Sequence, residues 1–169
     1  LAASSSAMKP SVRAELGAYE RFLLAREKMT QDGSKEAYES AVALLEEALG
    51  GIDVQLTRRA ELIPNLVETV KGYATHEKTV FEEVTAARTG VQRAAAVDDV
   101  PQKAAADAAL QQALVRVNAV AEGYPELKAS ANFQELQRQL AETENQLSFA
   151  RQYYNDAVST LNKLVSTIP

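Results

Sequence analysis

Apolar residues recur at steps of three and four along most of this chain, which is the spacing of one buried face of an α-helix. The longest run begins at Phe133, passes through Leu140 and Leu147, and reaches Ile168 without a break. It predicts a final helix of about 36 residues, capped by Asn132 and roughly 50 Å long at 1.5 Å per residue. A helix of this length cannot leave its apolar face in water, so we expect it to pack lengthwise against other helices.

The same spacing predicts helices over residues 12–30, 34–49, 52–95 and 101–122. Ser34 stands where the cap of the second helix belongs. Gly50-Gly51 predicts a weakened joint within a helix, because the apolar pattern resumes at once with Ile52. Pro64 lies inside a sustained apolar pattern, so we expect a kink there rather than an end. Asn65 could help to satisfy the freed carbonyl, but a solvated side chain is the preferred interpretation.

Three boundaries are marked by turn and capping residues. Gln31-Asp32-Gly33 predicts a turn between the first two helices. Asp98-Asp99 before Pro101 offers an acidic cap followed by a proline in the first helical turn, and Gly123-Tyr124-Pro125 should end that helix.

The predicted fold is therefore all-α: an antiparallel bundle of long helices, one of them kinked at Pro64, with an N-terminal helical hairpin over residues 12–49. We expect residues 1–10 to be a disordered linker or processed end, and residues 11–169 to form a single domain. The helices over 52–95 and 133–168 should lie along each other, with the 101–122 helix alongside.

The amino-acid composition excludes several kinds of catalytic and metal site. The chain of 169 residues has 46% hydrophobic but only 6% aromatic residues, no Cys and one His. Disulfides, thiolate chemistry and a zinc site built from several His are thereby excluded. A net charge of −5 argues against a nucleic-acid partner. We expect a protein that is not an enzyme and that holds no cofactor and no metal.

Two sets of charged residues are candidate sites. His76 neighbours Glu77, but adjacent helical residues point about 100° apart, so a structural or solvent-exposed role is the preferred interpretation. Arg58, Arg59 and Lys71 could bind a phosphate or lipid headgroup if they converged; interleaved acidic residues favour a solvated helix face instead.

At Thr143-Glu144-Asn145 the seam of the final helix turns polar while its spacing continues, with Thr143 itself on the seam. We expect Arg88 or Arg59, on the facing helix, to pair with Glu144 in a semi-buried polar layer that sets the register of the helices. A little further on, the helical spacing of Phe149, Tyr153 and Tyr154 favours a place in the core over a ligand platform.

Residues 52–77 (IDVQLTRRAELIPNLVETVKGYATHE) closely resemble the signature of the LemA family. Further pieces in the family's order extend the resemblance over residues 52–169: Ala86-Ala87-Arg88, Tyr124-Pro125-Glu126-Leu127-Lys128-Ala129, Asn132-Phe133, Thr143-Glu144-Asn145 and Tyr154-Asn155-Asp156-Ala157-Val158. Within residues 12–49, segments 18–26 and 36–49 resemble one tetratricopeptide-type helical pair, although no second copy follows at the expected period.

The LemA resemblance implies a long-helix bundle tethered to a bacterial membrane by one N-terminal spanning helix, with no established catalytic activity. The given sequence has no run of roughly 20 apolar residues, so we expect any membrane association to need an anchor that this chain lacks. We expect a scaffold or adaptor with protein partners, and homo-oligomers remain open. The alternative is a soluble peptide-binding or regulatory module whose hairpin lines a groove with Tyr19, Phe22 and Tyr38.

Overall fold

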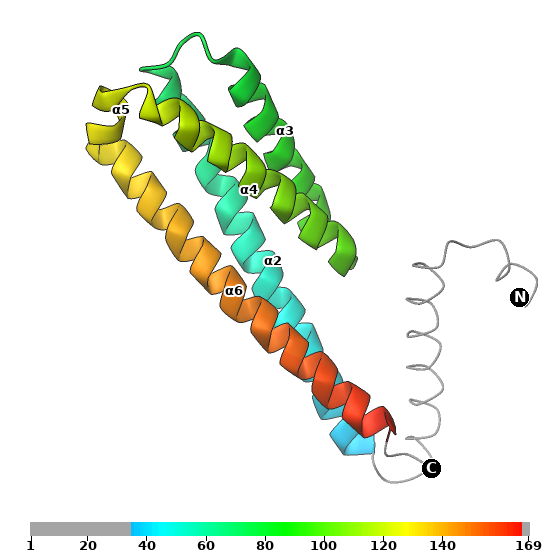
Figure 1. Cartoon of the computed structure of the whole chain (residues 1–169). Coiled ribbons are helices and arrows are strands. Elements are labelled where there is room, and N and C mark those ends of the chain that lie inside the picture. Colours follow the sequence, from blue (N-terminus) through cyan, green and yellow to red (C-terminus); the bar gives the residue numbers. More distant parts are fainter. Residues whose placement is uncertain (1–34, 167–169) are drawn as a thin grey trace, which may run out of the picture. The chain divides into compact units, whose positions relative to one another are not determined.

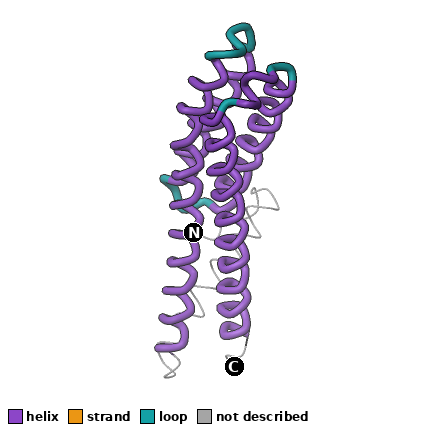
Figure 2. The backbone as a smooth tube through the Cα atoms, turned by 90° about the vertical axis from the view of Figure 1, so that its left-hand side faces the viewer, coloured by secondary structure: helices purple, strands orange, loops and turns teal. Residues whose placement is uncertain are grey.

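In the computed structural model, residues 35–166 are described, and helices joined by short connections make up that part of the chain (Figures 1 and 2). The helices are α2 (Lys35–Lys71), α3 (Lys78–Ala95), α4 (Val100–Glu122), α5 (Pro125–Ala129) and α6 (Ala131–Ser166). The all-α prediction is confirmed. The predictions for residues 1–34, including the helix over 12–30, the turn at Gln31-Asp32-Gly33 and the Ser34 cap, lie outside the described residues.

By its contacts the chain divides into two units, and residues 49–152 form the larger one. In this unit the parts of α2 and α6 run antiparallel, because Arg59 pairs with Glu144 whereas Thr69, later in α2, accepts a hydrogen bond from Asn132, earlier in α6. Helix α3 returns along α2, and α4 runs back along α3 (Figure 1). The result is an up-down-up-down bundle of α2, α3, α4 and α6, capped at one end by the short α5.

The core of the larger unit is aliphatic. Each long helix buries one stripe of side chains, and the fully buried members include Leu56, Ile63, Val84, Leu110 and Leu147. These stripes follow the three-and-four spacing read from the sequence.

The smaller unit contains residues 35–48 of α2 and 153–166 of α6. Its buried cluster consists of Tyr38, Ala41 and Leu161, with Val42 and Leu164 among the half-buried residues packed on it. Tyr38 therefore does not line an exposed groove, as the peptide-binding alternative requires. Tyr19 and Phe22, the other residues of that proposed groove, lie outside the described residues.

Helix α2 is continuous through both glycines and the proline, as the sequence predicted. It passes through Gly50-Gly51 and Pro64 without interruption, so residues 35–49 are the first part of a long helix and not the second arm of a separate hairpin. A Cβ placed on Gly51 would meet the Cβ of Ala150 at 3.9 Å, an ordinary contact, so no steric conflict requires glycine there. The two glycines lower the helix propensity of this segment, and tertiary packing keeps the helix continuous.

The prediction of one helix over 52–95 is wrong, because α2 ends at Lys71 and α3 begins at Lys78. Gly72 follows directly on α2, and Ala74 is buried within the connection. Ala74 and Phe81 are seven positions apart, and positions 77 and 78 between them carry no apolar side chain, although a continuous helix would need one there. The apolar residues on either side of the break belong to two antiparallel helices that share one core.

The structure confirms the predicted boundaries of α4, whereas α6 begins at Ala131 and not at Phe133 as predicted. Asp99 caps α4 by accepting from the amide of Gln102 at 2.9 Å, and proline stands in the first turn. Helix α6 begins at Ala131, and the Ser130 hydroxyl accepts from the amide of Phe133 at 3.4 Å. Asn132 is thus not the cap; its side-chain amide donates to Thr69 in α2 at 2.8 Å.

Candidate functional site: a buried charge network

Three charged side chains enter the core of the larger unit: Arg59 from α2, and Lys103 and Asp107 from α4. Arg59 is only 2% exposed. Moving a charge out of water is unfavourable by several kcal/mol unless close partners compensate for the lost hydration. Each of these groups therefore has to find charged or polar partners inside the bundle.

Arg59 joins α2 to both α4 and α6. Its Nη1 lies 2.6 Å from Oδ1 of Asp107 and 2.6 Å from Oε2 of Glu144, and its Nη2 donates to Gln111. Arg151 of α6 donates to the second oxygen of Asp107. Two guanidinium groups thus face two carboxylates, and the formal charges of this network balance.

The network is graded in exposure. Its centre, Arg59 with Asp107, is buried, whereas the side chains of Glu144 and Arg151 are 41% and 42% exposed. The Nε–H of Arg59 is the one part of this guanidinium that is buried and makes no hydrogen bond with the described residues. Water can hydrate Glu144 and Arg151 if their partners are removed, but it cannot reach Arg59 and Asp107 in the same way. We therefore expect the inner pair to dominate the energetics.

A second ion pair lies beside the first, nearer the start of α4. Lys103 Nζ lies 2.5 Å from Oδ1 of Asp53 in α2 and donates to the carbonyl of Ala94 at 3.1 Å. Ala94 belongs to the last turn of α3, where carbonyls lack helical partners and the helix dipole favours a cation. Lys103 therefore connects α4 to α2 and to the end of α3.

Arg88 has a different role from the one predicted. Its Nε donates to the carbonyl of Ala60 at 3.1 Å. In a regular helix that carbonyl would accept from the amide of the residue four positions later, which is Pro64 and has no N–H. Arg88 from α3 thus supplies the hydrogen bond that proline removes from α2, and exposed Asn65 does not. Glu144 is paired with Arg59 and not with Arg88.

The basic residues flanking Pro64 do not converge. Arg59 is buried in the network, whereas Arg58 is exposed on another side of α2. Lys71 lies 3.6 Å from Glu68 and stands over the ring of Phe81 at 5.8 Å from its centroid. The structure therefore does not unite these three residues in a phosphate or headgroup site.

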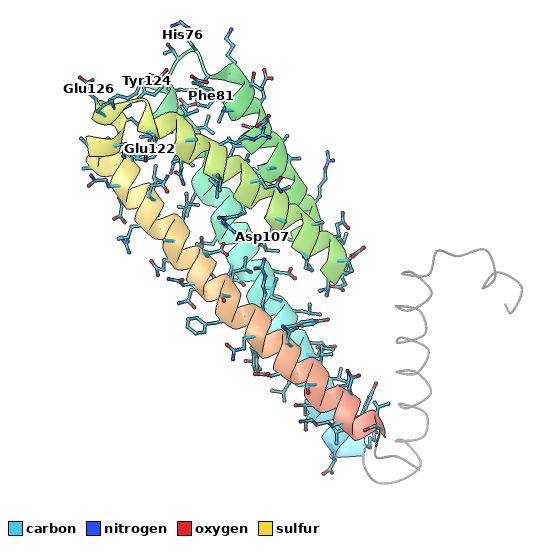
Figure 3. All side chains as sticks on the ribbon, viewed as in Figure 1. His76, Phe81, Asp107, Glu122, Tyr124 and Glu126 are labelled. Carbon is cyan, nitrogen blue, oxygen red and sulfur yellow. The ribbon has the colours of Figure 1, made fainter. Side chains whose placement is uncertain are left out.

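His76 and Asn145 are both exposed. Figure 3 shows His76 on the connection between α2 and α3, at the end of the bundle, well away from Asp107 among the helices. Within residues 35–166, no three acidic, His or Cys side chains are grouped so that they could hold a metal ion.

Three pKa shifts are resolved on α6. Hydrogen bonds from Arg138, followed by one from Gln139, lower the pKa of the exposed Glu135 carboxyl to about 2. The same pairing raises the pKa of Arg138. Burial raises the pKa of Tyr154. These shifts reflect local surface pairing and packing, and none belongs to a member of the charge network.

The aromatic residues of α6 were predicted to lie in the core, and for two of them this is wrong. Phe149 is 66% exposed, and Tyr153 is exposed as well, whereas Tyr154 is half-buried. The buried stripe near them uses Leu147 and Ala157 instead. Phe149 stands two positions from Leu147 and so points to the opposite side of the helix.

Sequence reasoning did not identify Asp107, Gln111, Lys103, Asp53 or Arg151 as site residues. A signal was present for two of them. Lys103 and Asp107 precede Leu110, Leu114 and Val117 at the same three-and-four steps, so both charges occupy the buried stripe of α4. A charge in such a position needs a partner on a facing helix.

The comparisons assign the chain to a family. The model of the LemA family matches residues 48–169, which is most of the chain. The chain belongs to the LemA family. Comparison with the curated proteins finds no similar sequence. The matched region includes α3, α4, α5, α6 and the second half of α2, so every member of the charge network falls within the LemA homology. No helix within residues 35–166 is both long and apolar enough to cross a membrane.

Proposed function

We propose that this LemA-family protein is a non-catalytic, membrane-associated helical scaffold or adaptor of the bacterial envelope. The observation that supports this role is the balanced charge network at the centre of the bundle. Its guanidinium and carboxylate groups bind one another across α2, α4 and α6. They thereby fix the relative positions of three helices instead of facing a substrate.

A scaffold has to present surfaces at fixed positions, and buried ion pairs serve that purpose. Arg59 reaches its partners only when α2, α4 and α6 have the observed register, since a shift by one turn would leave a buried charge without a counterion. An apolar core tolerates such shifts more readily. The protein partners that we propose would dock on the outer faces of these helices.

Site-specific photocrosslinking in the native bacterium tests the scaffold role. A photoreactive phenylalanine analogue would replace Val54 on the outside of α2, or Tyr73 at the end of the bundle, both of which are exposed. We expect each position to capture its own set of envelope proteins in the membrane fraction. Leu147, which is fully buried, is the matched control position. Capture at Val54 and Tyr73 no greater than at Leu147 would refute the proposed role.

A further inference from the structure

Three side-chain atoms of the larger unit are buried and make no hydrogen bond with the described residues. They are Nε of Arg59, Oε1 of Gln55 and Oε2 of Glu144. Oε2 of Glu144 lies 2.6 Å from Nη1 of Arg59, but the two atoms do not have the geometry of a hydrogen bond. Buried polar atoms almost always have a hydrogen-bond partner, so each of the three atoms needs one.

The three atoms belong to one stretch of the contact between α2 and α6. Gln55 precedes Arg59 by four positions, so the two side chains leave α2 on the same face. One turn before Gln55, a Cβ on Gly51 would meet Ala150 of α6, and one turn after it Arg59 contacts Glu144. Gln55 therefore faces the part of α6 that begins at Glu144 and ends at Ala150.

The hydrogen-bonding chemistry of these atoms selects a water molecule. Nε of Arg59 donates one hydrogen bond, whereas Oε1 of Gln55 and Oε2 of Glu144 accept. A water molecule donates two hydrogen bonds and accepts one here, which matches the three atoms. The guanidinium repels a cation at this place, and the carboxylate repels an anion. Buried waters in proteins typically make about three hydrogen bonds to groups that otherwise lack a partner.

We propose that one water molecule binds between α2 and α6, where it accepts from Nε of Arg59 and donates to Oε1 of Gln55 and Oε2 of Glu144. The two terminal nitrogens of this guanidinium already contact Asp107, Gln111 and Glu144. The water supplies the partner of the remaining N–H. It also connects Gln55 to the charge network.

Direct pairing between the side chains does not serve all three atoms. If Gln55 turned to accept from Nε of Arg59, Oε2 of Glu144 would still accept no hydrogen bond. If Glu144 turned to accept from Nε, it would give up its contact with Nη1, and Oε1 of Gln55 would stay unpaired. Each unpaired buried atom is unfavourable, so a single group that bridges all three is the better arrangement.

Nuclear magnetic resonance of the 169-residue chain tests this site. A rotating-frame Overhauser spectrum of the wild type should show a cross-peak between Hε of Arg59 and water, with the sign of a dipolar contact and not of chemical exchange. Gln55→Leu puts an apolar group in the place of the acceptor, so this cross-peak should disappear. Gln146→Leu is the matched control, because Gln146 is exposed on α6, and the cross-peak should persist. Helical circular dichroism checks that both variants are folded.

A crystal structure of the same chain gives a second readout. One water should lie within about 2.5–3.2 Å of Nε of Arg59, Oε1 of Gln55 and Oε2 of Glu144, and Gln55→Leu should hold no water at this position. A wild type without the cross-peak would overturn the proposal. So would a cross-peak that Gln55→Leu leaves unchanged, or a crystal structure in which Nε of Arg59 donates directly to Gln55 or Glu144. None of these results bears on the scaffold role, which is tested by capture at Val54 and Tyr73.

Discussion

The hydrogen bond from Arg88 to the Ala60 carbonyl should matter only because Pro64 in α2 lacks an N–H, and this dependence can be tested. Arg88→Met keeps much of the aliphatic stem but removes the donor. The carbonyl of Ala60, whose residue is fully buried, would then lack a partner because Pro64 has no N–H. Leaving a buried acceptor unsatisfied costs about 1–3 kcal/mol, and each kcal/mol lowers Tm by about 2–4 °C in a chain of this size. We therefore expect Arg88→Met to lower Tm by about 4–8 °C, for a central cost of about 2 kcal/mol.

The same substitution should matter much less once the proline is gone. Pro64→Ala restores an amide that can donate to Ala60, so Arg88→Met in that background should cost less than about 1 kcal/mol. Urea unfolding of the wild type, both single variants and the double variant, followed by circular dichroism, gives the four free energies. Arg93→Met, an exposed change on the same helix, is the control and should stay within about 0.5 kcal/mol of the wild type. Equal costs of Arg88→Met in the two backgrounds would refute the reasoning.

Three further predictions concern α2 and α6. Glu144→Ala should lower Tm by about 2–4 °C, because its carboxylate is 41% exposed and the buried arginine keeps another partner; an unchanged Tm in calorimetry would count against the pair. Gly50→Ala should raise the free energy of unfolding by about 0.5–1 kcal/mol, since a Cβ there meets nothing within 4 Å, and a loss of stability in urea would contradict this. In a carboxyl NMR titration Glu135 should show a pKa of about 2, and Arg138→Ala should return this pKa towards 4.5. Because the pKa is lower in the folded state, the stability that this pair contributes is present above the unfolded pKa and is lost as the pH falls towards 2.

The fold could be predicted from the sequence because periodicity reports directly on burial. The seam of α6, the cap at Asp99 and the persistence of the helix through Pro64 all follow from local rules. The break after Lys71 was missed because Ala74 and Phe81 lie seven positions apart, a two-turn step that hides the missing apolar residue at 77 or 78. Periodicity shows that a residue faces a core, but not which helix shares that core.

The candidate site was only partly predictable for the same reason. The polar stretch at Glu144 suggested an arginine partner, and the structure provides Arg59. Asp107 was not predicted, because nothing local in α4 shows that α2 carries its counterion 48 positions earlier in the chain. Similarly, Arg88 could be recognised as the partner of the Ala60 carbonyl only after the chain was known to turn back between α2 and α3.

The central claim is that the buried charge network holds the helices of this LemA-family protein together, and a double-mutant cycle on Arg59 and Asp107 tests it most directly. Arg59→Met, Asp107→Ala and the double variant would be unfolded in urea beside the wild type. If the network is structural, each single change removes the buried counterion of a buried charge and leaves only a partly exposed one, Glu144 for Arg59 or Arg151 for Asp107. Each should cost about 3 kcal/mol or more, whereas the double change costs much less than their sum. Single variants that are as stable as the wild type, or costs that add within about 0.5 kcal/mol, would contradict the account.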